Sequence, residues 1–288
     1  MSGRTIVVGY DRSADAKAAA RWALDEASLT GAPVEFLYAY DWPVWQADAS
    51  MVPTSAVWPD AETQQDIKDA VAEAVGLAGR SHPGVHTTIA TADNDAALAL
   101  VERSAEAGLI VLGSRGHSAV TNLLGSVSVA VSAHAHCPVV VVRGRPSTTA
   151  PIAVGVDGSA TSEAAVAFAA GEAAVRRVPL LMIRAWKPAG GLWARSTTGT
   201  HAEPADERRQ FDDHVAAWRE KYPQLDIAAE AVMEHPAAAL TRLSATTQLM
   251  VAGSRGRGAL RGMLLGSVSQ HLLRHSACDV AIVPGVHD

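Results

Sequence analysis

Short apolar runs alternate with amphipathic segments along the whole chain. The first cycle predicts a strand at Ile6–Gly9, a helix over Ala14–Leu29 and a second strand at Val34–Tyr40. Gly31 and Pro33 supply the signals that end the helix. Strands that alternate with helices in this way form a parallel sheet that the helices cover on both faces. The pattern therefore predicts an α/β fold.

The remaining elements of the first half continue this alternation. Helices are expected at Ala61–Ala78, Asp95–Ala107 and Ser126–Ala135, and strands at Val85–Ala90, Leu109–Leu112 and Pro138–Val142. The segment Tyr40–Pro59 is long and contains Trp42, Trp45 and Trp58. A loop of that length is typical of a lid or a contact surface.

The second half repeats the order of the first. Strands are expected at Ile152–Val156, Leu180–Ala185, Ile227–Val232, Gln248–Ala252 and Val280–Val283, and helices at Ser162–Val175, Pro204–Lys221, Ala237–Ala245 and Ser267–Arg274. A loop that holds Trp193 takes the place of the Trp-rich segment. The Pro-, Ser- and Thr-rich stretch Arg143–Pro151 separates the copies. We expect one domain over residues 1–145 and another over residues 150–288.

Two strings recur in both halves and carry the candidate chemistry. GSRG stands at Gly113–Gly116 and Gly253–Gly256, and LLGSVS follows at Leu123–Ser128 and Leu264–Ser269. In each copy an apolar strand enters a glycine turn, and a Gly-Ser pair then opens a helix. Such an arrangement supplies backbone N–H groups and a helix N-terminus, which hold phosphates. The alternative is that the glycines only permit turns and the serines are ordinary helix caps.

An aspartate ends the first strand of each half. Asp11 and Asp157 stand at the strand edge where open α/β sheets bind ligands. A carboxylate there accepts hydrogen bonds from ribose hydroxyls or an adenine amino group, or else caps the following helix. The chain has no G-x-x-x-x-G-K-[ST] string, and neither first strand is followed by G-x-G-x-x-G. A Walker-type triphosphatase and a dinucleotide oxidoreductase are therefore unsupported.

The pattern G-x2-G-x9-G-[ST], after V-x-V-D-G-S in the first strand, resembles the universal stress protein family in its tandem-domain form. The resemblance covers essentially the whole chain, twice. It implies two tandem Rossmann-like (adenine nucleotide alpha hydrolase-like) domains, each a five-stranded parallel-type sheet with helices on both faces. It also implies ATP binding, with the base at the first-strand Asp and the end of strand two, and the phosphates at the glycine loop. The implied residues are Gly9, Asp11, Ala39, Gly113, Arg115, Gly116, Gly125, Ser126 and Val127, and Gly155, Asp157, Ala185, Gly253, Arg255, Gly256, Gly266, Ser267 and Val268.

The first half departs from this pattern. Eight residues separate Gly116 from Gly125, against nine between Gly256 and Gly266, and Tyr10 and Arg12 flank the first Asp. We therefore expect substitutions at Gly266 or Asp157 to reduce binding more than substitutions at Gly125 or Asp11. The arginine inside each loop, Arg115 or Arg255, either pairs with phosphate oxygens or is a solvated side chain.

Composition limits the partners. The net charge of −6 provides no basic field for nucleic acid or anionic membranes. The N-terminus has no signal-peptide pattern and no apolar stretch reaches membrane-spanning length, so a cytoplasmic protein is expected. Cys137 and Cys278 occupy equivalent repeat positions. We interpret them as small buried side chains, with a disulfide as the alternative.

The sequence offers no duplicated catalytic machinery. The residues that match His86 and His117 are not His in the second half, and no nucleophile–base pair recurs. No carboxylate or cysteine completes a metal site around His271 and His275. Magnesium would enter only with ATP, through the phosphate oxygens. We therefore expect no catalytic residues and at most weak ATP hydrolysis.

The expected function is that of an ATP-dependent regulator in the stress response, with an unidentified regulatory protein as partner. The alternatives are a slow ATPase or nucleotidyl-transfer enzyme, and a nucleotide-free protein-interaction module. Single-domain members of the family it resembles typically dimerise. We expect the runs Val139–Val142 and Val280–Val283 to pair within one chain as a pseudo-dimer, and two chains to form a homodimer.

Overall fold

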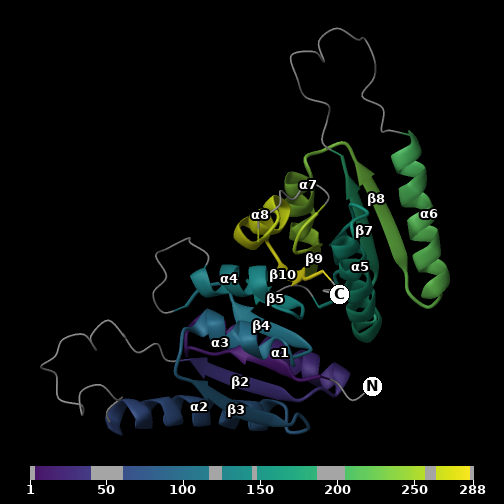
Figure 1. Cartoon of the computed structure of the whole chain (residues 1–288). Helices are drawn as coiled ribbons and strands as arrows, with labels where there is room; N and C mark the ends of the chain where they lie inside the picture. Colours follow the sequence, from purple (N-terminus) through teal and green to yellow (C-terminus); the bar gives the residue numbers. More distant parts are fainter. Residues whose placement is uncertain are drawn as a thin grey trace, which may run out of the picture. The chain divides into compact units, whose positions relative to one another are not determined.

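A computed structural model describes residues 4–39, 61–116, 125–144, 148–186, 205–256 and 264–285. The chain divides into two compact units, Met1–Val142 and Arg143–Asp288 (Figure 1). The Trp-rich segment Tyr40–Pro59 and Trp193 lie outside the described residues.

The first unit is a five-stranded parallel sheet. Its strands are β1 (Ile6–Gly9), β2 (Val34–Ala39), β3 (Thr87–Ala92), β4 (Leu109–Gly113) and β5 (Val139–Val142), in the order β3-β2-β1-β4-β5. Its helices are α1 (Ala14–Thr30), α2 (Ala61–Ser81), α3 (Ala96–Arg103) and α4 (Ser126–His134). The strand order reverses between β1 and β4, which is where open sheets of this kind bind ligands.

The second unit has the same topology. Its strands are β6 (Ile152–Gly155), β7 (Leu180–Ala185), β8 (Ile227–Val232), β9 (Leu249–Gly253) and β10 (Asp279–Val283), in the order β10-β9-β6-β7-β8. Its helices are α5 (Ala160–Arg176), α6 (Ala205–Lys221), α7 (Pro236–Leu243) and α8 (Ser267–His275), and a 3-10 turn at Ser244–Thr246 follows α7. The predicted fold of two tandem five-stranded α/β domains is confirmed.

The central strands and the helix ends follow from local sequence. Every residue of β5 and the first four of β4 are buried, as expected for parallel strands covered on both faces. The Ser13 hydroxyl accepts a hydrogen bond from the Ala16 N–H and caps α1. Gly31 ends that helix with a φ of 73°, a left-handed conformation that favours glycine.

Several predicted boundaries in the first half differ from the structure, and two of them differ for reasons that the hydrogen bonds show. The third strand begins at Thr87 rather than Val85, because the Val85 N–H donates to the His82 carbonyl in the turn after α2. The next helix ends at Arg103 rather than Ala107, because the N–H groups of Ala105 and Glu106 donate to carbonyls three residues earlier instead of four. Both errors lie at element ends.

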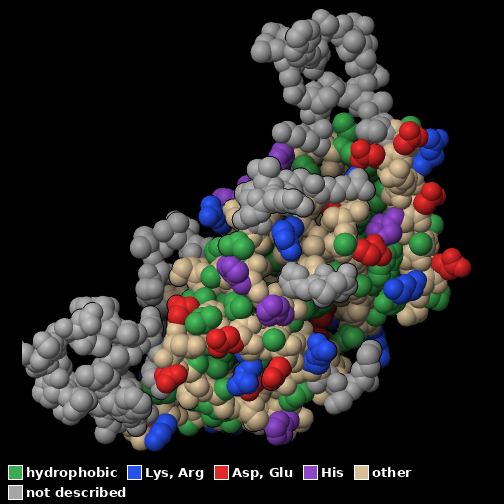
Figure 2. Space-filling view, in the orientation of Figure 1, with side chains coloured by type: hydrophobic (Ala, Val, Ile, Leu, Met, Phe, Trp, Pro, Cys, Tyr) green, Lys and Arg blue, Asp and Glu red, His purple; other side chains and the backbone are tan. Residues whose placement is uncertain are grey.

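Surface charge, helix hydrophobicity and cysteine burial can each be compared with what the sequence predicts. On the face shown in Figure 2, acidic and basic side chains are intermixed. Among the described helices, none is long and apolar enough to cross a membrane. Cys137 and Cys278 are buried and free. Burial raises the pKa of the Cys137 thiol to about 12 and also raises the pKa of Cys278, so both stay protonated as small core side chains.

Candidate functional site

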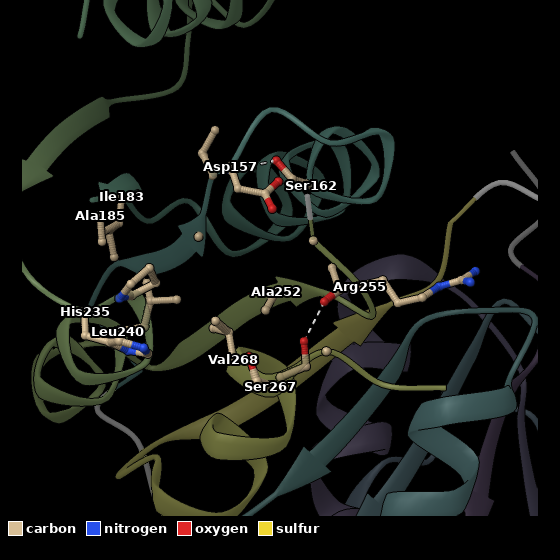
Figure 3. Close-up of a pocket in the computed structure, with 17 residues that line it drawn as sticks. Asp157, Ser162, Ile183, Ala185, His235, Leu240, Ala252, Arg255, Ser267 and Val268 are labelled. Atoms are coloured by element: carbon tan, nitrogen blue, oxygen red, sulfur yellow. Dashed lines mark hydrogen bonds between the residues drawn. The ribbon is translucent and has the colours of Figure 1, made fainter. Parts of the chain in front are cut away.

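A cavity of about 500 Å³ opens in the second unit at the carboxyl ends of β6 and β9 (Figure 3). All of the residues predicted for the second-half site line it: Gly155, Asp157, Ala185, Gly253, Arg255, Gly256, Gly266, Ser267 and Val268. They come from three strand ends, the glycine loop and the start of α8. The lining also includes residues that the sequence analysis did not single out, among them Ser162, Ile183, His235 and Leu240.

The glycine loop is fastened where it meets the cavity. The Gly266 N–H donates to the Ser254 carbonyl over 2.7 Å, and the Ser269 hydroxyl donates to the Gly253 carbonyl over 2.7 Å. Gly266 is the N-cap of α8, so Ser267 is the first helical residue, and no side-chain capping bond is made at this helix start. The serine is therefore no ordinary cap, and the first N–H groups of α8 are available for an anion.

Asp157 stands beside this loop without capping α5 itself. One carboxylate oxygen, Oδ1, accepts from the Ser159 N–H over 2.9 Å and from its hydroxyl over 2.6 Å. Ser159 is the residue that caps α5. A Cβ on Gly256 would collide with the other oxygen, Oδ2, so glycine is needed for the loop to pass the carboxylate. The aspartate is thus held at the cavity wall between the strand end and the loop.

The opposite end of the cavity is largely apolar. Figure 3 shows Ile183, Ala185, Leu240 and His235 gathered on one side, away from Ser267 and Arg255. Leu240 packs where β6 ends, since a Cβ on Gly155 would lie 2.9 Å from its Cδ1 atom. A planar, weakly polar group fits this wall better than a charged one.

His235 is the least expected of these lining residues. It is the N-cap of α7 but makes no side-chain capping bond, whereas its first-unit counterpart Asp95 accepts from the Leu98 N–H over 2.9 Å. The signal that would have found it is positional, because it follows β8 at the ligand-binding edge of the sheet.

The histidine pair on α8 does not make a metal site with other described residues. The ring centroids of His271 and His275 lie 4.4 Å apart. Within the described residues, no group of three or more metal-ligating side chains forms a metal site.

The first unit makes the same contacts at the two ends of its glycine loop. The Gly125 N–H donates to the Ser114 carbonyl over 2.9 Å, and the Ser128 hydroxyl donates to the Gly113 carbonyl over 2.8 Å. A Cβ on Gly116 would lie 2.7 Å from Oδ2 of Asp11. Gly9 and Ala39 end β1 and β2, Arg115 follows β4, and Ser126 and Val127 open α4. Residues 117–124 of this loop lie outside the described residues.

Larger side chains occupy the corresponding space in the first unit. Leu112 replaces the cavity-lining Ala252, and its Cδ2 atom would lie 2.5 Å from a Cβ on Gly9. Tyr10 replaces Val156 and packs edge-on against Phe36 at 5.8 Å between ring centroids. Burial raises the pKa of its phenol. The two sites therefore share the contacts at the ends of the glycine loop but differ in the size of the side chains beside it.

Comparison with known proteins identifies the family of this chain. The profile of the universal stress protein family matches residues 3–143 and 149–284. The chain belongs to the universal stress protein family. It is 34% identical over 298 residues to the universal stress protein Rv2005c of Mycobacterium tuberculosis, with 96% of each chain covered. It is 36% identical over 288 residues to Rv2623 of the same organism, covering 96% of this chain and 95% of that one.

A solved structure has the same fold over the full length. The universal stress protein from Archaeoglobus fulgidus DSM 4304 aligns with a TM-score of 0.73 at 18% sequence identity, covering 99% of each chain. The resemblance stated from the doubled glycine motif is therefore confirmed at the level of family and fold.

Proposed function

We propose that this universal stress protein binds ATP in the second-unit cavity and acts as a nucleotide-dependent regulator in the stress response. One observation carries the proposal: a single cavity joins an anion-binding loop, a carboxylate and an apolar wall in that order. Its volume of about 500 Å³ lies within the usual range of about 300–1,000 Å³ for small-molecule pockets.

Each part of the cavity suits one part of the nucleotide. The adenine base would pack against Ile183, Ala185 and Leu240. Asp157 would accept hydrogen bonds from ribose hydroxyls or from the adenine amino group. The phosphates would take N–H groups from the glycine loop and from the first turn of α8, where the helix dipole favours negative charge.

Magnesium fits the site only as part of the nucleotide. Of the cavity's described lining residues, Asp157 is the one carboxylate, and its Oδ1 atom already holds the cap of α5. A hard divalent cation prefers several oxygen ligands, which the phosphates supply. The residues thus support Mg²⁺ bound through ATP rather than in a protein-built site.

The same inventory favours regulation over turnover. The described ionisable side chains that line the cavity are Asp157, His235 and Arg255. His235 lies on the apolar side, away from Ser267 and Arg255, and the Oδ1 atom of Asp157 already holds Ser159. A general base must stand within hydrogen-bond reach of the attacking group.

Purified full-length protein should release ATP when it is denatured. Mass spectrometry of the released small molecules, with a matched titration of ATP into nucleotide-free protein by calorimetry, measures this. Recovery of ADP together with measurable phosphate release would support the slow ATPase or nucleotidyl-transfer alternative. Absence of both co-purified nucleotide and ATP binding would contradict the proposal and favour a nucleotide-free interaction module.

We also propose that the chain forms a homodimer, on the support of the family resemblance and the apolar terminal strands. Sedimentation equilibrium should then give about twice the chain mass of 30.0 kDa. A mass that stays at 30.0 kDa over the whole concentration range would contradict this.

A further inference from the structure

The arginine in the first unit's glycine loop is paired with a carboxylate of the same unit. Asp15 lies in the first turn of α1, and its Oδ2 atom accepts from the Ser114 hydroxyl over 2.8 Å and from Arg115 Nε over 3.1 Å. The backbone of Asp15 also approaches the loop closely, since a Cβ on Gly113 would lie 2.7 Å from its carbonyl carbon. A negative charge therefore sits at the base of this loop and neutralises its arginine.

The second unit has no carboxylate at the equivalent position. Thr161 stands there, in the first turn of α5, and its hydroxyl donates to the Arg255 backbone carbonyl. The hydroxyl also lies 3.0 Å from Ser159 Oγ. A Cβ on Gly253 would lie 2.9 Å from the Thr161 carbonyl carbon, so helix and loop approach each other as they do in the first unit. The geometry is preserved while the charge is not.

Arg255 therefore keeps its charge for a ligand. Among the described residues, its guanidinium makes no hydrogen bond or ion pair. It lines the cavity, and Figure 3 shows its long side chain extending from the loop away from the other labelled residues. A guanidinium without a protein partner is well suited to phosphate oxygens, which it binds through two parallel N–H groups.

We propose that the residue at this helix position decides how each loop treats phosphate charge. Thr161 makes the second unit selective for nucleotides with a di- or triphosphate over the nucleoside. Asp15 makes the first unit favour adenine ligands of low charge, the nucleoside and its monophosphate. This inference rests on the proposed nucleotide binding and adds which ligand class each unit accepts.

The size of the effect follows from the exposure of the pair. The Asp15 side chain is 24% exposed and the Arg115 side chain 47% exposed, so solvent weakens their interaction. An approaching polyphosphate must nevertheless compete with the carboxylate for Arg115 and is repelled by its charge. We therefore expect that a carboxylate introduced at Thr161 lowers ATP affinity about tenfold, since hydrogen bonds between charged groups are the strong ones.

The decisive variant is Thr161→Asp, with Thr161→Asn as a control of the same shape and no charge. Calorimetry on the full chain should show ATP affinity about tenfold lower in Thr161→Asp than in Thr161→Asn. Adenosine affinity should be equal in the two variants. Aspartate in the first turn of a helix interacts favourably with the helix dipole, as Asp15 does in α1, so α5 should stay folded.

The reciprocal variant Asp15→Asn tests the inference even if Thr161→Asp fails to fold. It should strengthen ATP binding at the weaker site and leave adenosine binding there unchanged. Equal ATP affinity in Thr161→Asp and Thr161→Asn, or no gain in Asp15→Asn, overturns the inference. A parallel loss of ATP and adenosine overturns it too, because the position would then act on site shape. A wild-type chain that binds neither ligand refutes the proposed function itself, and the inference with it.

Discussion

Valine at Gly266 should weaken ATP binding by about tenfold or more, whereas valine at Gly125 should weaken it much less. A Cβ on Gly266 would lie 3.3 Å from the Ser254 carbonyl oxygen and 3.4 Å from the Arg255 Cα, both backbone atoms of the glycine loop. At Gly125 the nearest atoms stand off at 3.6 and 3.8 Å. Overpacking of this kind costs about 1–3 kcal/mol, and about 1.4 kcal/mol is a tenfold change in affinity.

The expected loss of ATP affinity at Gly266 comes from steric crowding alone. Its φ of −67° and ψ of 151° are extended angles that any residue adopts, so backbone strain adds nothing to the effect. Alanine should accordingly do less harm than valine. Calorimetric titration of ATP into Gly266→Val and Gly125→Val chains measures the difference, and the melting temperature of each variant shows how much of the crowding acts on the fold rather than on the site. Equal losses in the two variants would refute the inequality of the sites while leaving ATP binding intact.

Much of the fold could be predicted because its signal is local and doubled. The buried strands β4 and β9 are unbroken apolar runs, and each enters the same GSRG string. The third strand was misplaced by two residues because it pairs on one side only, with β2, and half of its side chains are exposed. Its polar and apolar residues therefore carry little positional information. Repetition identified the topology, but hydrogen bonds set the strand's first residue.

The candidate site was also predictable only where its residues belong to a local motif. The loop glycines and Asp157 could be predicted because they lie in short motifs of consecutive residues that recur in both halves. Leu240 could not, since it reaches the cavity only because α7 packs across the end of β6. No local pattern encodes that contact. Equally, the sequence left open whether Arg115 and Arg255 act alike, and the structure separates them through one residue on the neighbouring helix.

Alanine at Gly253 should destabilise the chain by about 2–3 kcal/mol, through a clash that no side-chain movement relieves. Its Cβ would lie 2.9 Å from the carbonyl carbon of Thr161 and 3.0 Å from the carbonyl oxygen, both in the backbone of α5. Helix and strand must separate to admit it. Chemical denaturation of the nucleotide-free chain measures the change, because bound ligand would add its own stabilisation.

Gly171→Ala is the matched control, because Gly171 lies in α5, the helix that a side chain at Gly253 would push away. Nothing lies within 4 Å of a Cβ there, so the substitution should stabilise α5 by about 0.5–1 kcal/mol through helix propensity. A Gly253→Ala chain as stable as wild type would contradict the close approach of α5 to β9. The comparison also separates two roles that the GSRG string combines. Gly253 makes room for a helix, whereas Gly256 makes room for the Asp157 carboxylate, so stability should respond to the first glycine and ATP affinity to the second.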